Sequence, residues 1–328
     1  MNPSNASRTA LATSLMRAVH SRLDPLPLFD DEWGDRLVPD SVRAALRQRT
    51  VSNMEPDARA KALMSSDAEF DYGLRANAAY PDVIVRARYT EDALRAAVAR
   101  GVTQYVIIGA GFDSFSCRRP AYADQLNIYE VDHPATQSLK RQRLMECGVP
   151  VSEYVHFVSA DLSVEKLGDA LARSSFKPSE PTFFSWLGVT MYLTRDSNLT
   201  ALRGIASCAA HGSELVFTYV DETVFTSAYV ATDSFHDLKA QVAAIGEAFL
   251  SGFDPGSLNE QLLGTGLQLL EDLNGEQAVA RYDQNGTNQL KSATEAHIVR
   301  ASVVGASEPK AVNPSFKRTG PGKPGLAA

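Results

Sequence analysis

Short apolar runs that alternate with helical stretches dominate the sequence after Gly101. The runs are QYVIIG, LNIYEVD, VHFVSAD, PTFFSWL and SELVFTYV; ATQSLKRQRLMECG links the second to the third, and RDSNLTALRGIASCA the fourth to the fifth. Buried parallel strands have this apolar character, and the helices between them complete βαβ units. SLNEQLLGTGLQLLEDL then predicts a helix and a strand, and EAHIVRASVV a last strand. We therefore expect an α/β fold with a mostly parallel sheet.

The first hundred residues predict helices only. Residues 7–24 repeat apolar side chains at helical spacing, and the two prolines of DPLPLFDD end that pattern. Residues 40–100 are rich in Ala, Arg and Leu, and within TEDALRAAVARG we expect Thr90 to be an N-cap and Gly101 to end the helix. Residues 306–328 carry prolines and basic residues with little apolar content, which predicts a disordered tail.

Length and composition bound the fold and the partners. A chain of 328 residues with 44% hydrophobic residues can bury one large core. Its 32 basic and 39 acidic residues give a net charge of −7, so no overall positive field attracts nucleic acid as the principal partner. The N-terminal segment lacks the apolar core of an export signal, and no apolar stretch reaches about 18 residues. We expect a cytoplasmic protein without a membrane partner.

The cysteines predict neither disulfides nor a metal site. Cys117, Cys147 and Cys208 are widely spaced, with no CxxC pair and no histidine at metal-ligand spacing. This pattern is typical of reduced thiols in a cytosolic protein.

Glycines and carboxylates stand where three predicted strands end. VIIGAG ends the first run in Gly109 and Gly111, whose missing Cβ atoms let backbone N–H groups approach a ligand. YEVD ends the second in Asp132, about 20 residues after Gly111, where it can accept hydrogen bonds from both hydroxyls of a ribose. VSAD ends the third in Asp161, beside Leu162, so that a carboxylate can hold an amino group while an alkyl chain supports a flat base. Ligands of such sheets bind at this edge.

The glycine turn departs from the dinucleotide-binding fingerprint. Ser114 stands where the third glycine of that fingerprint belongs, and Asp113 adds a negative charge close to where phosphates would lie. The turn therefore suits an adenosine ligand without phosphates. S-adenosylmethionine fits, because it has a ribose, an adenine and a zwitterionic methionine end.

Each of these residues also has a structural interpretation. The glycine pair can form a tight turn without a ligand, and Asp132 or Asp161 can cap the helix that follows it. Asp113 supports the turn or contacts the ligand. We assign no role to His133, which is expected to face solvent at a helix start. Four other side chains are interpreted as paired, solvated or packed beneath the site: Arg118, Arg119, Trp186 and Tyr192.

Five segments together resemble a known family. TALATSLMRAVHSRLDPLPLFDD, QYVIIGAGFDSFSCRR, IYEVDHPATQSLKRQRL, FVSADL and FFSWLGVTMYLT are similar in order and spacing to bacterial S-adenosylmethionine-dependent methyltransferases of the leucine carboxyl methyltransferase superfamily. The resemblance covers about residues 7–302. It implies a Rossmann-like class I methyltransferase fold, with a seven-stranded, mostly parallel sheet and an N-terminal helical cap. Residues 1–100 would form the cap, and residues 101–305 the S-adenosylmethionine-binding domain.

The resemblance also implies roles for the residues at the strand ends. Gly109 and Gly111 would line the methionine part of the cofactor, and Asp132 would bind its ribose. Asp161 and Leu162 would hold the adenine.

Two positions complicate the comparison with the family. In VIVRARY, Arg86 matches a family arginine near the cofactor carboxylate or the substrate, although Arg88 is close enough to compete for that alignment. Many relatives carry Glu after the Trp of the WxGVTMYL segment, where this chain has Leu187.

The expected activity is methyl transfer from S-adenosylmethionine to a small molecule, with S-adenosylhomocysteine as the second product. The sequence shows no clear general base, so the catalytic residues are unassigned. This favours a carboxylate acceptor, which needs no base, or an acidic hydroxyl. One alternative is a nicotinamide-dependent oxidoreductase, which Ser114 opposes; another is a non-catalytic binding protein with the same fold, which Leu187 favours. No sequence pattern identifies the acceptor or the oligomeric state.

Overall fold

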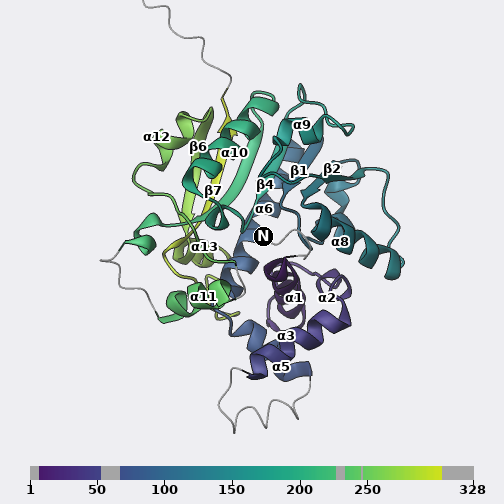
Figure 1. The fold of residues 1–328 in the computed structure, drawn as a ribbon, viewed down its shortest axis with the longest axis vertical. Coiled ribbons are helices and arrows are strands. Elements are labelled where there is room, and N and C mark those ends of the chain that lie inside the picture. The colour runs from purple at the N-terminus through teal and green to yellow at the C-terminus, as the bar shows by residue number, and fades with distance from the viewer. Residues whose placement is uncertain (1–6, 53–66, 227–232, 245–246, 305–328) are drawn as a thin grey trace, which may run out of the picture.

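The computed structural model describes residues 7–52, 67–226, 233–244 and 247–304. Along these ranges helices come first, and a seven-stranded sheet with further helices follows (Figure 1). The tail that we predicted to be disordered lies outside the described residues. Within the described ranges, no helix has the length and apolar character needed to span a membrane.

The sheet has the strand order β3-β2-β1-β4-β5-β7-β6. The first five strands pair in parallel, and β7 lies antiparallel between β5 and β6. The strands are β1 (Gln104–Ile108), β2 (Asn127–Asp132), β3 (Val155–Ser159), β4 (Thr182–Trp186), β5 (Glu214–Val220), β6 (Leu267–Asn274) and β7 (Ala296–Val303). The predicted mostly parallel sheet is confirmed. Strand order reverses between β1 and β4, which is where such sheets bind their ligands.

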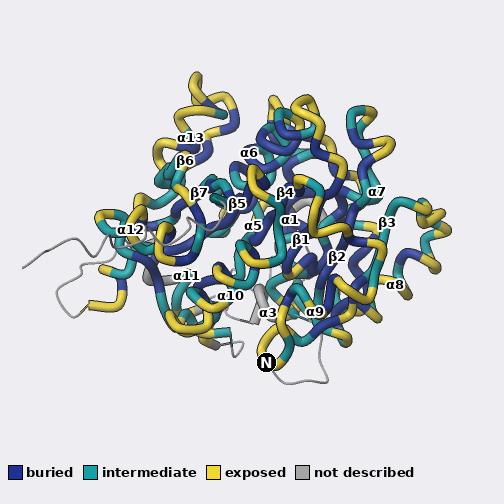
Figure 2. Tube along the Cα trace, turned by 90° about the horizontal axis from the view of Figure 1, so that it is seen from above, coloured by how far each residue is buried: buried dark blue, intermediate teal, exposed yellow. Residues whose placement is uncertain are grey.

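The strands at the centre of the sheet are covered on both faces. Every residue of β1, β4 and β5 is buried, and in Figure 2 dark blue is concentrated in the middle of the molecule while yellow is most common at its periphery. On one face Ile84 and Leu94 of α6 (Tyr80–Ala99) share a core with Phe183, while on the other Leu202 of α10 (Arg195–Cys208) packs with Phe184. Successive strand residues thus point to opposite cores, which explains the continuous apolar runs.

Different helices supply the two covering layers. The first layer contains α6 (Tyr80–Ala99) and α13 (Gly275–Tyr282), and the second contains α9 (Leu167–Leu171), α10 (Arg195–Cys208) and α12 (Leu258–Leu263). The other helices beyond β1 are α7 (Phe115–Arg118), α8 (Pro134–Glu146) and α11 (Asp233–Ala244), with the short 3₁₀ helices η1 (Ala121–Ala123), η2 (Thr190–Tyr192) and η3 (Glu222–Phe225).

The N-terminal helices gather at one end of the sheet, as the purple ribbons of Figure 1 show. They are α1 (Arg8–Leu23), α2 (Trp33–Arg36), α3 (Asp40–Ser52) and α5 (Asp67–Arg75). The all-helical character predicted for the first hundred residues is confirmed for the part of that region that the structure describes.

The predicted helix start at Thr90 is wrong, because α6 continues through this residue. The helix begins after Ala79, with Pro81 in its first turn, and the Thr90 hydroxyl donates to the Arg86 carbonyl at 2.7 Å within the helix. A threonine inside a helix can donate its hydroxyl to the carbonyl four residues earlier, and it then does not act as an N-cap. Gly101 follows the helix with a φ of 98° and ends it, as predicted.

A buried carboxylate joins the N-terminal helices to the turn after β1. Asp31 Oδ2 accepts from Arg17 Nε at 2.9 Å and from Ser114 Oγ at 2.6 Å, and Oδ1 accepts from the Gly34 N–H at 3.0 Å. Arg17 also donates through Nη2 to the Phe112 carbonyl at 2.6 Å. Both charges of the Arg17–Asp31 pair are therefore buried and matched, and they fix α1 against the sheet.

We expect Asp31→Ala to destabilise the fold strongly. The substitution leaves the buried Arg17 guanidinium without its carboxylate, which typically costs about 3 to 5 kcal/mol in the free energy of unfolding. Urea unfolding of the variant and the parent measures this loss. Asp30→Ala is the matched control, because the neighbouring Asp30 is exposed. Equal losses in the two variants would contradict the role given to Asp31.

Candidate functional site

The glycine turn after β1 is packed tightly against protein. Gly109 and Gly111 have φ values of 68° and 51°, a region in which side chains are strained. A Cβ on Gly109 would lie 2.8 Å from Val189 Cγ2, and a Cβ on Gly111 would lie 2.9 Å from Ala10 Cβ on α1. Both glycines are therefore required by the turn itself, with or without a ligand.

Asp113 supports this turn. Its Oδ1 accepts from the Phe115 N–H at 2.8 Å, at the start of α7. Its carbonyl accepts from Lys140 Nζ at 2.6 Å, and the same ammonium group contacts Glu130 Oε2 at 2.6 Å. The buried Lys140 thus ties the turn to β2.

Asp132 closes the turn from the end of β2. Its Oδ2 accepts from the Gly111 N–H, and its Oδ1 accepts from the His133 N–H at 2.6 Å. Burial raises the pKa of Asp132, and the two N–H donors partly offset that rise. Each carboxylate oxygen has a second lone pair, so two further hydroxyl donors can still be accepted. His133, not Asp132, caps α8 by accepting from the Ala135 N–H at 3.3 Å.

Asp161 and Leu162 follow β3 at the same edge. Asp161 Oδ1 accepts from Ser163 Oγ at 2.6 Å and from the Ser163 N–H at 3.0 Å, and these bonds hold the pKa of Asp161 below its usual value. Its Oδ2 lies 3.9 Å from His133 Nε2, which brings the ends of β2 and β3 together. Leu162 is 39% exposed and offers an open alkyl surface.

Arg86 reaches this edge from α6. A Cβ on Gly188, which follows β4, would lie 2.8 Å from Arg86 Nη2, so this glycine leaves room for the guanidinium. Burial lowers the pKa of Arg86, and no described residue holds the guanidinium by a hydrogen bond or ion pair. Arg88 is occupied, because it donates to Asp92 at 3.0 Å and to the Leu28 carbonyl at 2.6 Å.

A cavity of about 90 Å³ adjoins Arg86. Its walls come from α1, α6, η2, α11 and the adjacent ends of β5 and β7. Most of the wall is apolar and includes Val83, Met191, Val220, Phe235, Leu238 and Phe249. Since Arg86 and Gly188 both line it, the cavity opens beside the strand ends that carry the glycine turn.

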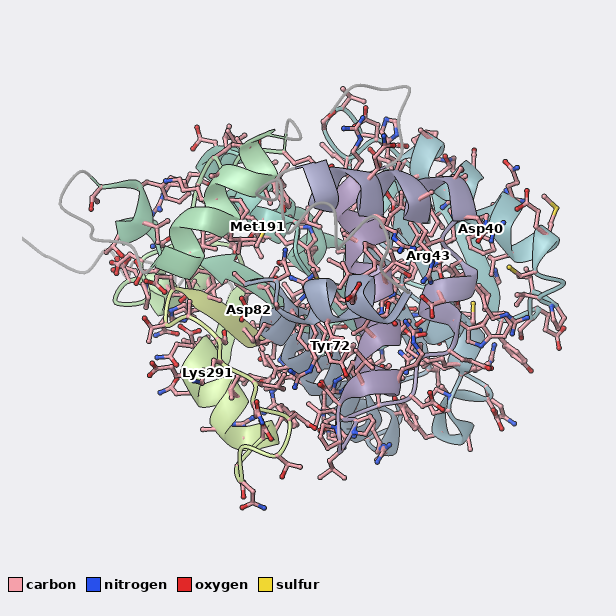
Figure 3. All side chains as sticks on the ribbon, turned by 90° about the horizontal axis from the view of Figure 1, so that it is seen from below. Asp40, Arg43, Tyr72, Asp82, Met191 and Lys291 are labelled. Carbon is pink, nitrogen blue, oxygen red and sulfur yellow. The ribbon has the colours of Figure 1, made fainter. Side chains whose placement is uncertain are left out.

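Among the described residues, one carboxylate lines this cavity. Asp82, labelled in Figure 3, lies one helical turn before Arg86 on α6, and both residues line the cavity. Ser292 Oγ donates to Asp82 Oδ1. Burial raises the pKa of Asp82 to about 6, although Ser292 and Arg86 oppose the rise. The sequence analysis missed Asp82; its spacing of four residues from Arg86, which places both on one helical face, was the available signal.

The start of α1 lies between the glycine turn and the cavity. The Ser7 N–H donates to Thr136 Oγ1 at 3.4 Å, and Ala10 contacts Gly111. On the other side, Thr9 Oγ1 donates to Glu247 Oε2, and Ser7 Oγ donates to Glu247 Oε1 at 3.3 Å. One short stretch of helix therefore touches both parts of the candidate site.

The residues interpreted as structural follow that interpretation with one exception. Arg118 pairs with Glu91 at 2.5 Å, Arg119 donates to a backbone carbonyl, and Trp186 is buried. Tyr192 instead lines the cavity, and burial raises its pKa to about 12. Among the described residues, no group of His, Cys, Asp and Glu is arranged to hold a metal ion.

The chain is similar to a known protein family and to named bacterial methyltransferases. Residues 10–206 match the leucine carboxyl methyltransferase family. A protein of Bacillus subtilis, named as an S-adenosyl-L-methionine-dependent methyltransferase, is 31% identical over 306 residues, which cover 92% of this chain and 99% of the relative. A protein of Parafrankia sp. with the same type of name is 35% identical over 208 residues, which cover 63% of this chain and 61% of the relative.

A solved structure shares the fold. It is a methyltransferase structure from Thermobifida fusca that superposes with a TM-score of 0.54 over 89% of this chain and 94% of its own. At 12% identity this likeness shows the fold alone.

The raised pKa of Asp82 predicts a pH-dependent stability. Between the unfolded value near 4 and the folded value of about 6, the folded chain holds a proton that the unfolded chain releases. Stability therefore falls as pH rises through this window, by at most about 3 kcal/mol, and the cost persists at higher pH. The Asp82→Asn variant has no carboxyl group to ionise at this position. We therefore expect its free energy of unfolding, relative to that of the parent, to increase between about pH 4 and about pH 7. Urea unfolding at several pH values measures the difference; a constant difference would contradict the prediction.

Proposed function

Because this chain belongs to the leucine carboxyl methyltransferase family and is an S-adenosylmethionine-dependent methyltransferase, we propose that it methylates an oxygen atom of a small molecule held in the cavity beside α6. The observation that carries this proposal is the position of the cavity. It adjoins the strand-end edge through Arg86 and Gly188, so that a ligand in it can reach a donor at that edge.

Four predictions made from the sequence are confirmed: the family, the class I methyltransferase fold, the enzyme class and S-adenosylmethionine as the cofactor. The nicotinamide-dependent oxidoreductase considered as an alternative is set aside by the family and its relatives. The same relatives set aside a binding protein without catalysis, although Leu187 stands where the family resemblance led us to expect Glu.

The residues at the strand ends fit the cofactor that the family uses. Asp132 retains lone pairs for two ribose hydroxyls, and Leu162 offers an alkyl surface for the adenine. Arg86 is half-buried, and none of the described residues pairs with its guanidinium, so it can meet the methionine carboxylate. The residues that we assign to cofactor binding are Arg86, Gly109, Gly111, Asp132, Asp161 and Leu162.

The chain's own contribution to methyl transfer is alignment and exclusion of water. S-adenosylmethionine supplies an electrophilic methyl group, whose transfer needs an acceptor atom in line about 3 Å away. The helix α1 contributes Thr9 and Thr13 to the cavity and Ala10 to the glycine turn, so it covers both ligands. We therefore retain residues 1–100 as the proposed cap and residues 101–305 as the proposed cofactor-binding domain.

The oxygen assignment is tested with S-adenosylmethionine that carries a trideuteromethyl group. Incubation with the purified enzyme and a metabolite extract transfers the label to the acceptor, which mass spectrometry then identifies. We expect the label on oxygen, as an ester or an ether. Label on nitrogen, sulfur or carbon would overturn the proposal.

Asp132→Ala is expected to weaken S-adenosylhomocysteine binding at least about 100-fold. Hydrogen bonds to a charged group contribute about 1.5 to 3 kcal/mol each, and the proposal has Asp132 accept two from the ribose. Isothermal titration calorimetry measures the affinity. Asp124→Ala, which alters an exposed carboxylate after η1, serves as the control and should bind like the parent.

The same variant separates the ligand role of Asp132 from its structural role. Asp132 also accepts from the Gly111 and His133 N–H groups, so some loss of melting temperature is expected as well. Affinity within about threefold of the parent, together with a lower melting temperature, would make Asp132 purely structural.

A further inference from the structure

The half-buried Asp82 differs from the buried carboxylates Asp24 and Asp31. Asp24 is held by three donors, and although burial alone would raise its pKa, these donors hold the pKa of Asp24 below its ordinary value. The donors are His20, Arg75 and Tyr80. Asp31 is likewise matched by Arg17 and Ser114. Asp82 has only the neutral Ser292 hydroxyl, on Oδ1, and none of the described residues donates to its Oδ2.

A carboxylate oxygen that lines an apolar cavity without a donor from the protein is available to a ligand. Asp82 lines the cavity, and in Figure 3 its label lies between those of Met191 and Lys291. A donor group on a ligand in the cavity would give Oδ2 its missing hydrogen bond. The position of Asp82 therefore favours a ligand that has a hydrogen-bond donor.

The charges around Asp82 favour a neutral donor. Glu295, which precedes β7, adds a second negative charge near Asp82 and has a buried Oε2 without a hydrogen bond. Arg86 is the cation that faces Asp82, but in the proposed function it pairs with the carboxylate of the cofactor. An anionic acceptor would then enter an apolar cavity against a carboxylate, which is unfavourable.

We propose that Asp82 accepts the proton of a neutral hydroxyl on an apolar acceptor, so that the product is a methyl ether and not a methyl ester. This inference rests on the proposed methylation of oxygen and narrows it to one substrate class. The apolar walls formed by Met191, Phe235 and Phe249 suit the carbon skeleton of such an acceptor.

The proton and electron balance is simple. The hydroxyl proton moves to Asp82 Oδ2 while the acceptor oxygen forms its bond to the methyl carbon. The carbon–sulfur bond breaks, and its electron pair remains on sulfur, so the sulfonium becomes a neutral thioether. Asp82 then releases its proton to solvent, which its pKa of about 6 permits at neutral pH.

Matched ligand pairs test the inference directly. The probes are 4-ethylphenol with 4-ethylbenzoic acid, and 1-naphthol with 1-naphthoic acid, titrated by calorimetry into the protein saturated with S-adenosylhomocysteine. At about pH 8 we expect the parent to bind each phenol at least about 10-fold more tightly than its acid. At about pH 5, where Asp82 is protonated, that preference should disappear.

Asp82→Asn should abolish the preference at both pH values, because the variant carries no charge at this position. Asp92→Asn, also on α6 but outside the cavity, is the matched control and should retain the preference and its pH dependence. These controls matter because other ionisable groups line the cavity or face Asp82: Arg86 on α6, Tyr192 on η2, Tyr219 on β5, Glu295 before β7 and His297 on β7.

The outcomes separate this inference from the proposed function. Failure of S-adenosylhomocysteine to bind would count against the cofactor site itself. Three outcomes with normal cofactor binding would overturn the role of Asp82. They are a preference of the parent for the acids, binding of neither member of a pair, and an unchanged preference in Asp82→Asn. In the labelling experiment, an alkali-labile methyl ester would overturn the ether product, while methylation of oxygen would still stand.

Discussion

The turn between β1 and α7 is fixed by carboxylates that approach it from two sides. Asp31, in the loop after α1, binds Ser114 at the end of the turn, and Asp132, at the end of β2, binds the Gly111 N–H at its centre. Neither contact would form without the other elements in place, since Asp31 is held by Arg17 of α1. The proposed cofactor site is therefore assembled by the N-terminal helices and the sheet together.

Sequence patterns predicted the sheet well because its strands are buried on both faces and carry unbroken apolar runs. The strand-end residues followed from the same reasoning, since parallel strands finish at one edge. Thr90 was misread because its hydroxyl bonds within α6, a choice that local sequence does not reveal. Asp82 was missed because its environment depends on α6 lying against the ends of β5 and β7, which are far away in the sequence.

The carboxylates that the fold removes from solvent differ in how many donors they have, and under our proposal this difference separates stability from function. Asp31 and Asp24 have several donors each and hold elements together. Asp82 has one neutral donor and a raised pKa, so at neutral pH its ionisation weakens the fold. An ionisable group that lowers the stability of the fold in this way is often one whose hydrogen bonds are completed by a ligand and not by the protein.

The first turn of α1 touches Gly111 and Thr136 on one side and Glu247 on the other. The start of α1 thus lies between the proposed donor and acceptor compartments. If one ligand shifted this segment, the other compartment would change shape as well, and by thermodynamic reciprocity each ligand would alter the affinity of the other by the same factor. The affinities of the two substrates would then depend on this helix as well as on the residues that contact them.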